Sequence, residues 1–60
     1  IVANIIALGF LATYTGIVSE KSIREAVEDR FAGTKYFDMN LKALEEGFKL
    51  GREYAKKYPL

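Results

Sequence analysis

The chain has 60 residues, no cysteine, no histidine and a formal net charge of +1. The lack of both side chains excludes the usual zinc sites and any nucleophile–base pair built on them. The small net charge gives no electrostatic basis for binding nucleic acid or anionic lipid. Residues 1–19 are uncharged, and residues 20–60 carry all nine basic and all eight acidic side chains. Because 60 residues bury only a small core, this division predicts that a partner or a larger domain covers the uncharged segment.

The first predicted helix covers about residues 2–14 and is apolar on several of its sides. Ile5 and Leu8 lie on one stripe, and most of the remaining positions are also apolar. This pattern is typical of a helix that is enclosed on several sides. Gly9 in the middle costs about 1 kcal/mol of helix propensity relative to alanine, which predicts close approach of another backbone. Gly16 stands where a left-handed residue would end the helix.

A membrane span is an alternative interpretation of residues 1–17. A helix that ends before Gly16 rises only about 22 Å, less than the roughly 30 Å of a hydrocarbon core. The polar side chains of Asn4, Thr13 and Thr15 dilute the segment further. We therefore expect a helix buried in protein, with no membrane partner. Asn4 is expected either to bond to a neighbouring backbone or to contact a partner.

The second predicted helix covers about residues 20–31. Ser19 is a suitable N-cap, because its hydroxyl can accept a bond from a free backbone N–H. Glu20 with Arg24 has the i, i+4 spacing of a favourable surface pair, and Gly33 is placed to end the helix. The first two helices also resemble a helix-turn-helix, but residues 20–31 hold three basic and four acidic side chains. A net negative helix argues against phosphate contact, so we expect no nucleic-acid partner.

The third predicted helix covers about residues 39–57, with Asp38 as its N-cap and Pro59 preventing continuation. Gly47 and Gly51 form a G-x-x-x-G pattern on one side of it. In membranes this pattern brings helices together, but here it lies among charged residues. We expect that the two small residues let another helix or strand approach closely and thereby form an assembly surface.

Three short motifs follow one another along the chain. Residues 4–11 read N-I-I-A-L-G-F-L and residues 15–19 read T-G-I-V-S. An amphipathic helix that ends in Phe31 follows, and then residues 40–47 with the pattern N-L-x-A-L-x-x-G. In their order and spacing across essentially the whole chain, these motifs resemble the C-terminal part of the gamma subunit of 2-oxoacid:ferredoxin oxidoreductases.

The resemblance implies that this helical segment belongs to a longer α/β gamma domain with a glycine-rich loop upstream. The implied enzyme has several subunits, oxidatively decarboxylates a 2-oxoacid to an acyl-CoA, and reduces ferredoxin. Thiamine diphosphate, iron–sulfur clusters and CoA are implied for the whole enzyme, where other subunits or domains would hold them. The implied partners of this chain are the rest of the gamma domain and the other subunits, in the cytoplasm.

We therefore expect an all-α segment, residues 1–60, that is one incomplete domain and has no activity by itself. No residue is a candidate for catalysis, cofactor binding or metal ligation. The candidates for packing or interface roles are Asn4, Gly9, Gly16, Asn40, Gly47 and Gly51. One alternative is a free-standing helical interaction module that homo-oligomerises through the first helix and the Gly47/Gly51 face. Another is a small membrane-associated helix with a soluble tail.

Overall fold

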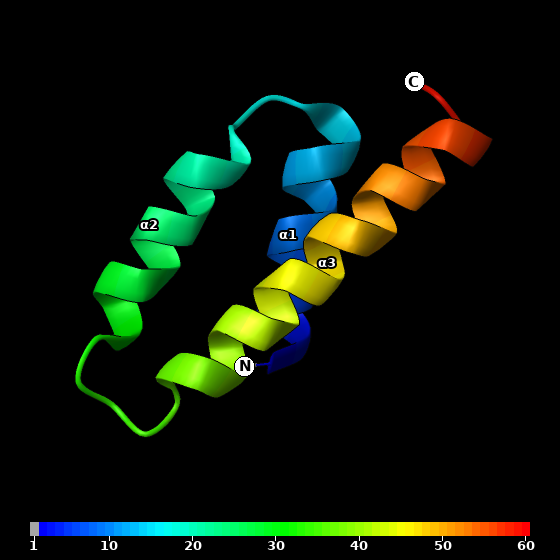
Figure 1. The fold of residues 1–60 in the computed structure, drawn as a ribbon. Coiled ribbons are helices and arrows are strands. Elements are labelled where there is room, and N and C mark those ends of the chain that lie inside the picture. Colours follow the sequence, from blue (N-terminus) through cyan, green and yellow to red (C-terminus); the bar gives the residue numbers. More distant parts are fainter. Residues whose placement is uncertain (1) are drawn as a thin grey trace.

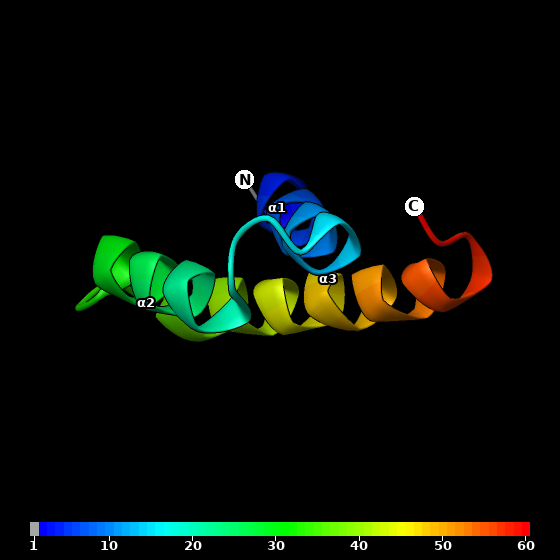
Figure 2. The same ribbon diagram turned by 90° about the horizontal axis from the view of Figure 1, so that it is seen from above.

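The computed structural model describes residues 2–60, which form three α-helices and no strand. Helix α1 spans Val2–Thr15, α2 spans Glu20–Phe31 and α3 spans Phe37–Lys57. The prediction of an all-α chain with three helices is therefore confirmed. Helices α2 and α3 lie beside each other in one layer, and α1 crosses over α3 on one side of that layer (Figures 1 and 2). Most of the tertiary contact is between α1 and α3.

The turns follow from residues that the sequence places at the helix ends. Gly16 has a φ of +68° and Gly33 a φ of +75°, which is the left-handed region that glycine enters at no steric cost. The backbone N–H of Gly16 donates to the carbonyl of Ala12 at 3.0 Å and so closes the last turn of α1. The hydroxyl of Ser19 accepts a hydrogen bond from the Ser22 N–H at 3.1 Å. The predicted end of α1 and the predicted cap of α2 are confirmed.

The predicted N-cap of α3 is wrong. The helix begins at Phe37, Tyr36 holds the N-cap position, and Asp38 lies within the first turn. The preceding turn explains the earlier start, because the Thr34 hydroxyl accepts from the Tyr36 N–H at 3.2 Å and the Thr34 carbonyl accepts from the Phe37 N–H at 3.3 Å. Asp38 still suits its place, since a carboxylate in the first turn interacts favourably with the helix dipole.

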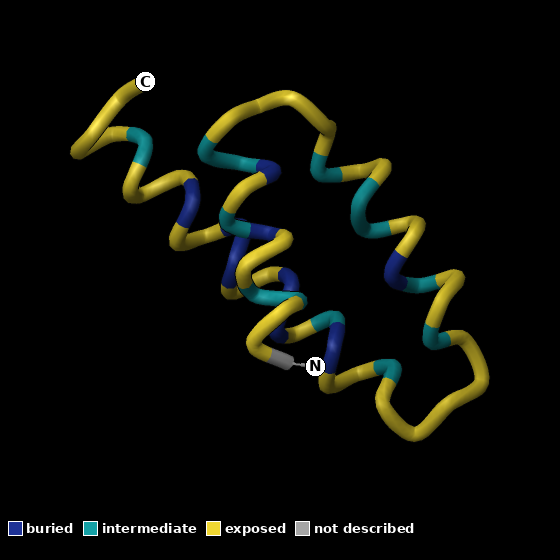
Figure 3. The backbone as a smooth tube through the Cα atoms, turned by 180° about the vertical axis from the view of Figure 1, so that it is seen from behind, coloured by how far each residue is buried: buried dark blue, intermediate teal, exposed yellow. Residues whose placement is uncertain are grey.

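The core is small and centred on α3. Leu44 and Phe48 are fully buried, and Val27 of α2 and Ala12 of α1 pack with them. Buried positions gather where α1 and α3 overlap, with a further one on α2 (Figure 3). None of the helices in the described range is both long and apolar enough to cross a membrane.

Candidate functional site

Three glycines bring the backbones of α1 and α3 into contact. A Cβ atom on Gly9 would lie 2.7 Å from the carbonyl oxygen of Leu44. A Cβ atom on Gly47 would overlap the carbonyl oxygen of Ile6, and one on Gly51 would overlap the side chain of Thr13. The close approach expected at Gly9 is therefore observed, and the helix that approaches Gly47 and Gly51 is α1 of the same chain.

This contact occupies the Gly47/Gly51 face of α3. Both glycines are buried, and Gly9 opposite them is buried as well. Because α1 covers this face, a second copy of the chain has no access to it while α1 stays in place. Self-association through the Gly47/Gly51 face would require α1 to leave its position.

The opposite side of α1 is exposed and carries no charge. We call this side the outer face of α1; its members are Ala3, Asn4, Ala7, Leu8, Leu11 and Thr15. Leu11 is 57% exposed and Leu8 is 39% exposed. Ile17, in the turn that follows, is 84% exposed. The sequence predicts a helix enclosed on several sides, whereas the other two helices of this chain cover only one side of it.

The two candidate asparagines have opposite environments. Asn4 is exposed on the outer face of α1, and its side chain makes no hydrogen bond with the residues that the structure describes. Asn40 is 1% exposed, and its Nδ2 donates to the carbonyl of Tyr36 at 2.9 Å. The Oδ1 of Asn40 has no donor within residues 2–60. Gly16 lies in the exposed turn that follows α1.

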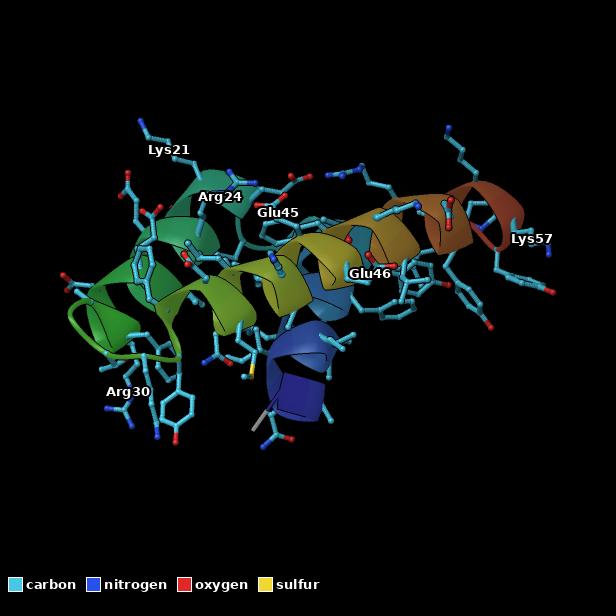
Figure 4. The ribbon with its side chains drawn as sticks, turned by 60° about the horizontal axis from the view of Figure 1, so that its bottom comes forward. Lys21, Arg24, Arg30, Glu45, Glu46 and Lys57 are labelled. Carbon is cyan, nitrogen blue, oxygen red and sulfur yellow. The ribbon has the colours of Figure 1, made fainter. Side chains whose placement is uncertain are left out.

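Charged side chains join α2 to α3. Arg24 pairs with Glu45 at 2.6 Å, and Arg52 pairs with Glu20 at 2.6 Å. The predicted pair of Glu20 with Arg24 is therefore wrong, because each of the two side chains reaches across to α3 instead. Figure 4 shows Arg24 of α2 and Glu45 of α3 next to each other. The hydrogen bond to Glu20 raises the pKa of Arg52 above its usual value.

Four aromatic rings pack against one another where the C-terminal ends of α1 and α3 meet. Phe10 and Tyr14 of α1 contact Tyr54 of α3 with ring centroids 5.4 and 5.7 Å apart, and Tyr54 contacts Tyr58 at 4.8 Å. The Tyr14 hydroxyl donates to the carbonyl of Tyr58 at 2.6 Å. Sequence reasoning missed this cluster. The available signal was the i, i+4 spacing of aromatic residues on both helices.

An apolar groove runs between α1 and α2, and sequence reasoning missed it too. We call it the α1–α2 groove; it has a volume of about 240 Å³ and is lined by Ile5, Leu8, Ala26, Val27, Arg30 and Phe31. Leu8 belongs to both this groove and the outer face of α1, so the two surfaces are continuous. A larger and more open hollow beside α2 is lined by Glu25, Glu28 and Asp29 among other residues.

The residues of this chain do not fit an iron–sulfur cluster. Proteins hold such clusters chiefly through cysteine thiolates, and the sequence contains no cysteine. Among residues 2–60, no group of three or more histidine, cysteine, aspartate or glutamate side chains is placed to hold a metal ion. The arrangement of the outer face and the α1–α2 groove is instead suited to contact with another protein surface.

Residues 1–50 match the family model of pyruvate ferredoxin/flavodoxin oxidoreductase. The chain belongs to this family. No curated protein and no protein of known structure gave a significant match. The family agrees with the oxidoreductase resemblance that the sequence motifs indicate.

Proposed function

We propose that this chain is the C-terminal part of the gamma subunit of a 2-oxoacid:ferredoxin oxidoreductase. In this role it catalyses nothing itself, completes the fold of the gamma domain and helps to hold the subunits together. Family membership supports the oxidoreductase, and the order of the motifs at residues 4–11, 15–19 and 40–47 supports the gamma subunit. The enzyme would work in the cytoplasm.

The outer face of α1 carries this proposal. Burial of apolar surface contributes about 25 cal/mol per Å², so a helix with Leu8 and Leu11 turned to water forgoes stabilisation that a partner surface would supply. Exposed apolar patches of this kind mark sites of contact with other proteins or domains. The charged side chains lie on α2, α3 and the connecting turn between them, and none lies on α1. The charged helices α2 and α3 are therefore suited to contact with solvent, and the outer face of α1 is suited to contact with another protein surface.

The proposed role leaves the chemistry to the rest of the enzyme. That enzyme would decarboxylate a 2-oxoacid, form an acyl-CoA and reduce ferredoxin. Thiamine diphosphate, the iron–sulfur clusters and CoA would be bound by other subunits or domains. This assignment is consistent with the lack of cysteine in the sequence, and it makes the contribution of residues 1–60 one of assembly.

Native mass spectrometry of the protein, purified from its own cells, tests the proposal. We expect residues 1–60 to be recovered with the rest of a gamma domain and with larger oxidoreductase subunits. Leu11→Glu should reduce the amount of intact complex, because it places a charge in the middle of the outer face of α1. Lys49→Glu changes an exposed side chain of α3. It is the matched control and should leave the complex intact. Recovery of the 60 residues only as a defined folded oligomer would instead support the helical interaction module.

A further inference from the structure

Helix α2 is attached to the core through one short apolar stripe. Among its twelve residues, all within the described range, Val27 is buried, whereas α3 buries six residues. Val27 belongs to the same cluster as Leu44 and Phe48, and Ile23 and Phe31 pack against that cluster while partly exposed. Because burial of apolar surface is the main stabilising term in folding, α2 is held less strongly than α3.

The polar contacts of α2 with α3 lie at the surface. Arg24 pairs with Glu45 and Glu20 pairs with Arg52, each at 2.6 Å, and all four side chains are more than a third exposed. Exposed ion pairs of this kind contribute little and weaken as salt is added. The Arg24 guanidinium also lies 5.3 Å from the centre of the Phe48 ring. These contacts place α2 on α3 without holding it there firmly.

Helix α1 contacts α3 closely and α2 only in part. An open hollow of about 240 Å³ lies between α1 and α2. Against α3, by contrast, the backbones meet at Gly9 and Gly47, and the Tyr14 hydroxyl donates to the carbonyl of Tyr58 at 2.6 Å. The packing of α1 on α3 therefore does not need α2 between them.

Both ends of α2 are joined to the other helices by turns that contain a glycine. Gly16 has a φ of +68° and Gly33 a φ of +75°. A Cβ atom on either glycine would meet no atom of the described residues within 4 Å. Glycine enters many backbone conformations, and hinges are formed by a few residues that absorb a change of φ and ψ. The capping bond of Ser19 with the Ser22 N–H lies at the start of α2 and can move with it.

From these observations we propose that α2 is a lid, which opens as one unit about Gly16 and Gly33 while α1 and α3 stay packed. Opening breaks both ion pairs, withdraws Val27 from the core and uncovers the face of the Phe48 ring beneath Arg24. Segments with few buried apolar contacts open in this way at a lower free energy than the whole fold. The inference goes beyond the proposed function and does not depend on it.

Hydrogen exchange of the backbone amides tests the lid, measured by mass spectrometry on the intact protein purified from its own cells. After correction for intrinsic rates, residues 23–31 should exchange about tenfold faster than residues 43–51 of α3, or more. The rates along residues 23–31 should agree within about threefold, because the helix leaves as one unit. Equal protection of the two segments, or exchange that is fast only at the ends of α2, would overturn the proposal.

Gly47→Ala distinguishes opening of the lid from unfolding of the whole molecule. The new Cβ would overlap the carbonyl oxygen of Ile6, so it destabilises the α1–α3 contact, which is present both when the lid is closed and when it is open. Exchange of residues 43–51 should therefore become about a hundredfold faster, while exchange of residues 23–31 stays the same within about twofold. An equal acceleration of both segments would show that all three helices unfold together, and the lid would be wrong.

Removal of the ion pairs tests what keeps the lid closed, and it does not depend on the stability of the Gly47→Ala variant. The double change Glu45→Ala with Arg52→Ala should accelerate exchange of residues 23–31 about fivefold, and 1 M salt should have a similar effect on the unchanged protein. Lys49→Ala, at an exposed position on α3 outside both pairs, is the matched control and should not alter the rate. Exchange that responds to neither the double change nor salt would contradict a lid held by these pairs.

Discussion

Helix α3 contacts its two neighbours in different ways. In its contact with α1 the two backbones meet at Gly9, Gly47 and Gly51, and aromatic side chains pack at one end. Its contact with α2 is made by side chains, with Val27 at the centre and two exposed ion pairs at the edge. At its three glycines the first contact has no room for an added atom, whereas the long side chains of the second contact can move.

This difference indicates which substitutions each contact tolerates. Protein interiors are packed so closely that one additional methyl group lowers stability. At the glycines of the α1–α3 contact, backbone atoms of the two helices face each other. Exposed ion pairs contribute little, because water and salt compete with them. We therefore expect large effects on the α1 side of α3 and small ones on the α2 side.

The largest effect is expected where a charge is placed on the buried stripe of α3. Asn40 is 1% exposed, and its Oδ1 lacks a donor within residues 2–60. Asn40→Asp buries a carboxylate without a partner and should lower the free energy of unfolding by about 4 kcal/mol. Asn40→Leu removes the same amide without adding a charge and should cost about 1 kcal/mol or less. Urea denaturation measures both, and equal losses would show that burial of the charge is not the cause.

The next effect tests the glycine contact directly. Gly47→Ala should lower the free energy of unfolding by about 3 kcal/mol, because the new Cβ would overlap the carbonyl of Ile6. In an exposed helix the same change would add about 1 kcal/mol of stability, so the sign of the effect is informative. Lys42→Ala, at an exposed position on α3, is the control and should change stability by less than about 0.5 kcal/mol. A thermal melt in which Gly47→Ala raises Tm would mean that α1 and α3 can separate at little cost.

A smaller effect is expected at the start of α2, where local bonds support a helix with less tertiary contact. Ser19→Ala removes the acceptor of the Ser22 N–H and should cost about 1 kcal/mol. Ser22→Ala is the matched control, since it keeps that N–H and loses only the bond between the two hydroxyls at 2.9 Å. We expect the denaturation midpoint to fall more for Ser19→Ala than for Ser22→Ala, and the reverse order would contradict the cap.

The smallest effect is expected for the ion pair of Arg24 and Glu45. Both side chains are more than a third exposed, so a double-mutant cycle to alanine should give a coupling energy of about 0.5 kcal/mol. The coupling should shrink further in 1 M salt, where the screening length is about 3 Å. Arg24 also lies over the ring of Phe48 at 5.3 Å, so its single mutant should lose more than that of Glu45. A coupling well above 1 kcal/mol that is independent of salt would remove the distinction between the two contacts.

Local chemistry in the sequence determined the helices and most of their ends. Ser19 caps α2 because its hydroxyl accepts a bond from a backbone N–H nearby in the chain. Gly16 and Gly33 end helices because their φ angles are positive and glycine has no Cβ to oppose this. The small size of Gly9 was likewise sufficient to predict a close contact. All of these signals act over a few residues, so they can be read without the fold.

Tertiary structure alone decided which surfaces meet. Gly47 and Gly51 predicted a close neighbour, but only the fold identifies it as α1. Glu20 and Arg24 have the spacing of a pair on one helix, yet each binds a residue of α3, because the charges on α3 lie within reach once α2 has packed. The aromatic cluster and the α1–α2 groove join residues far apart in the chain. Such features depend on the crossing of helices, which no short stretch of sequence specifies.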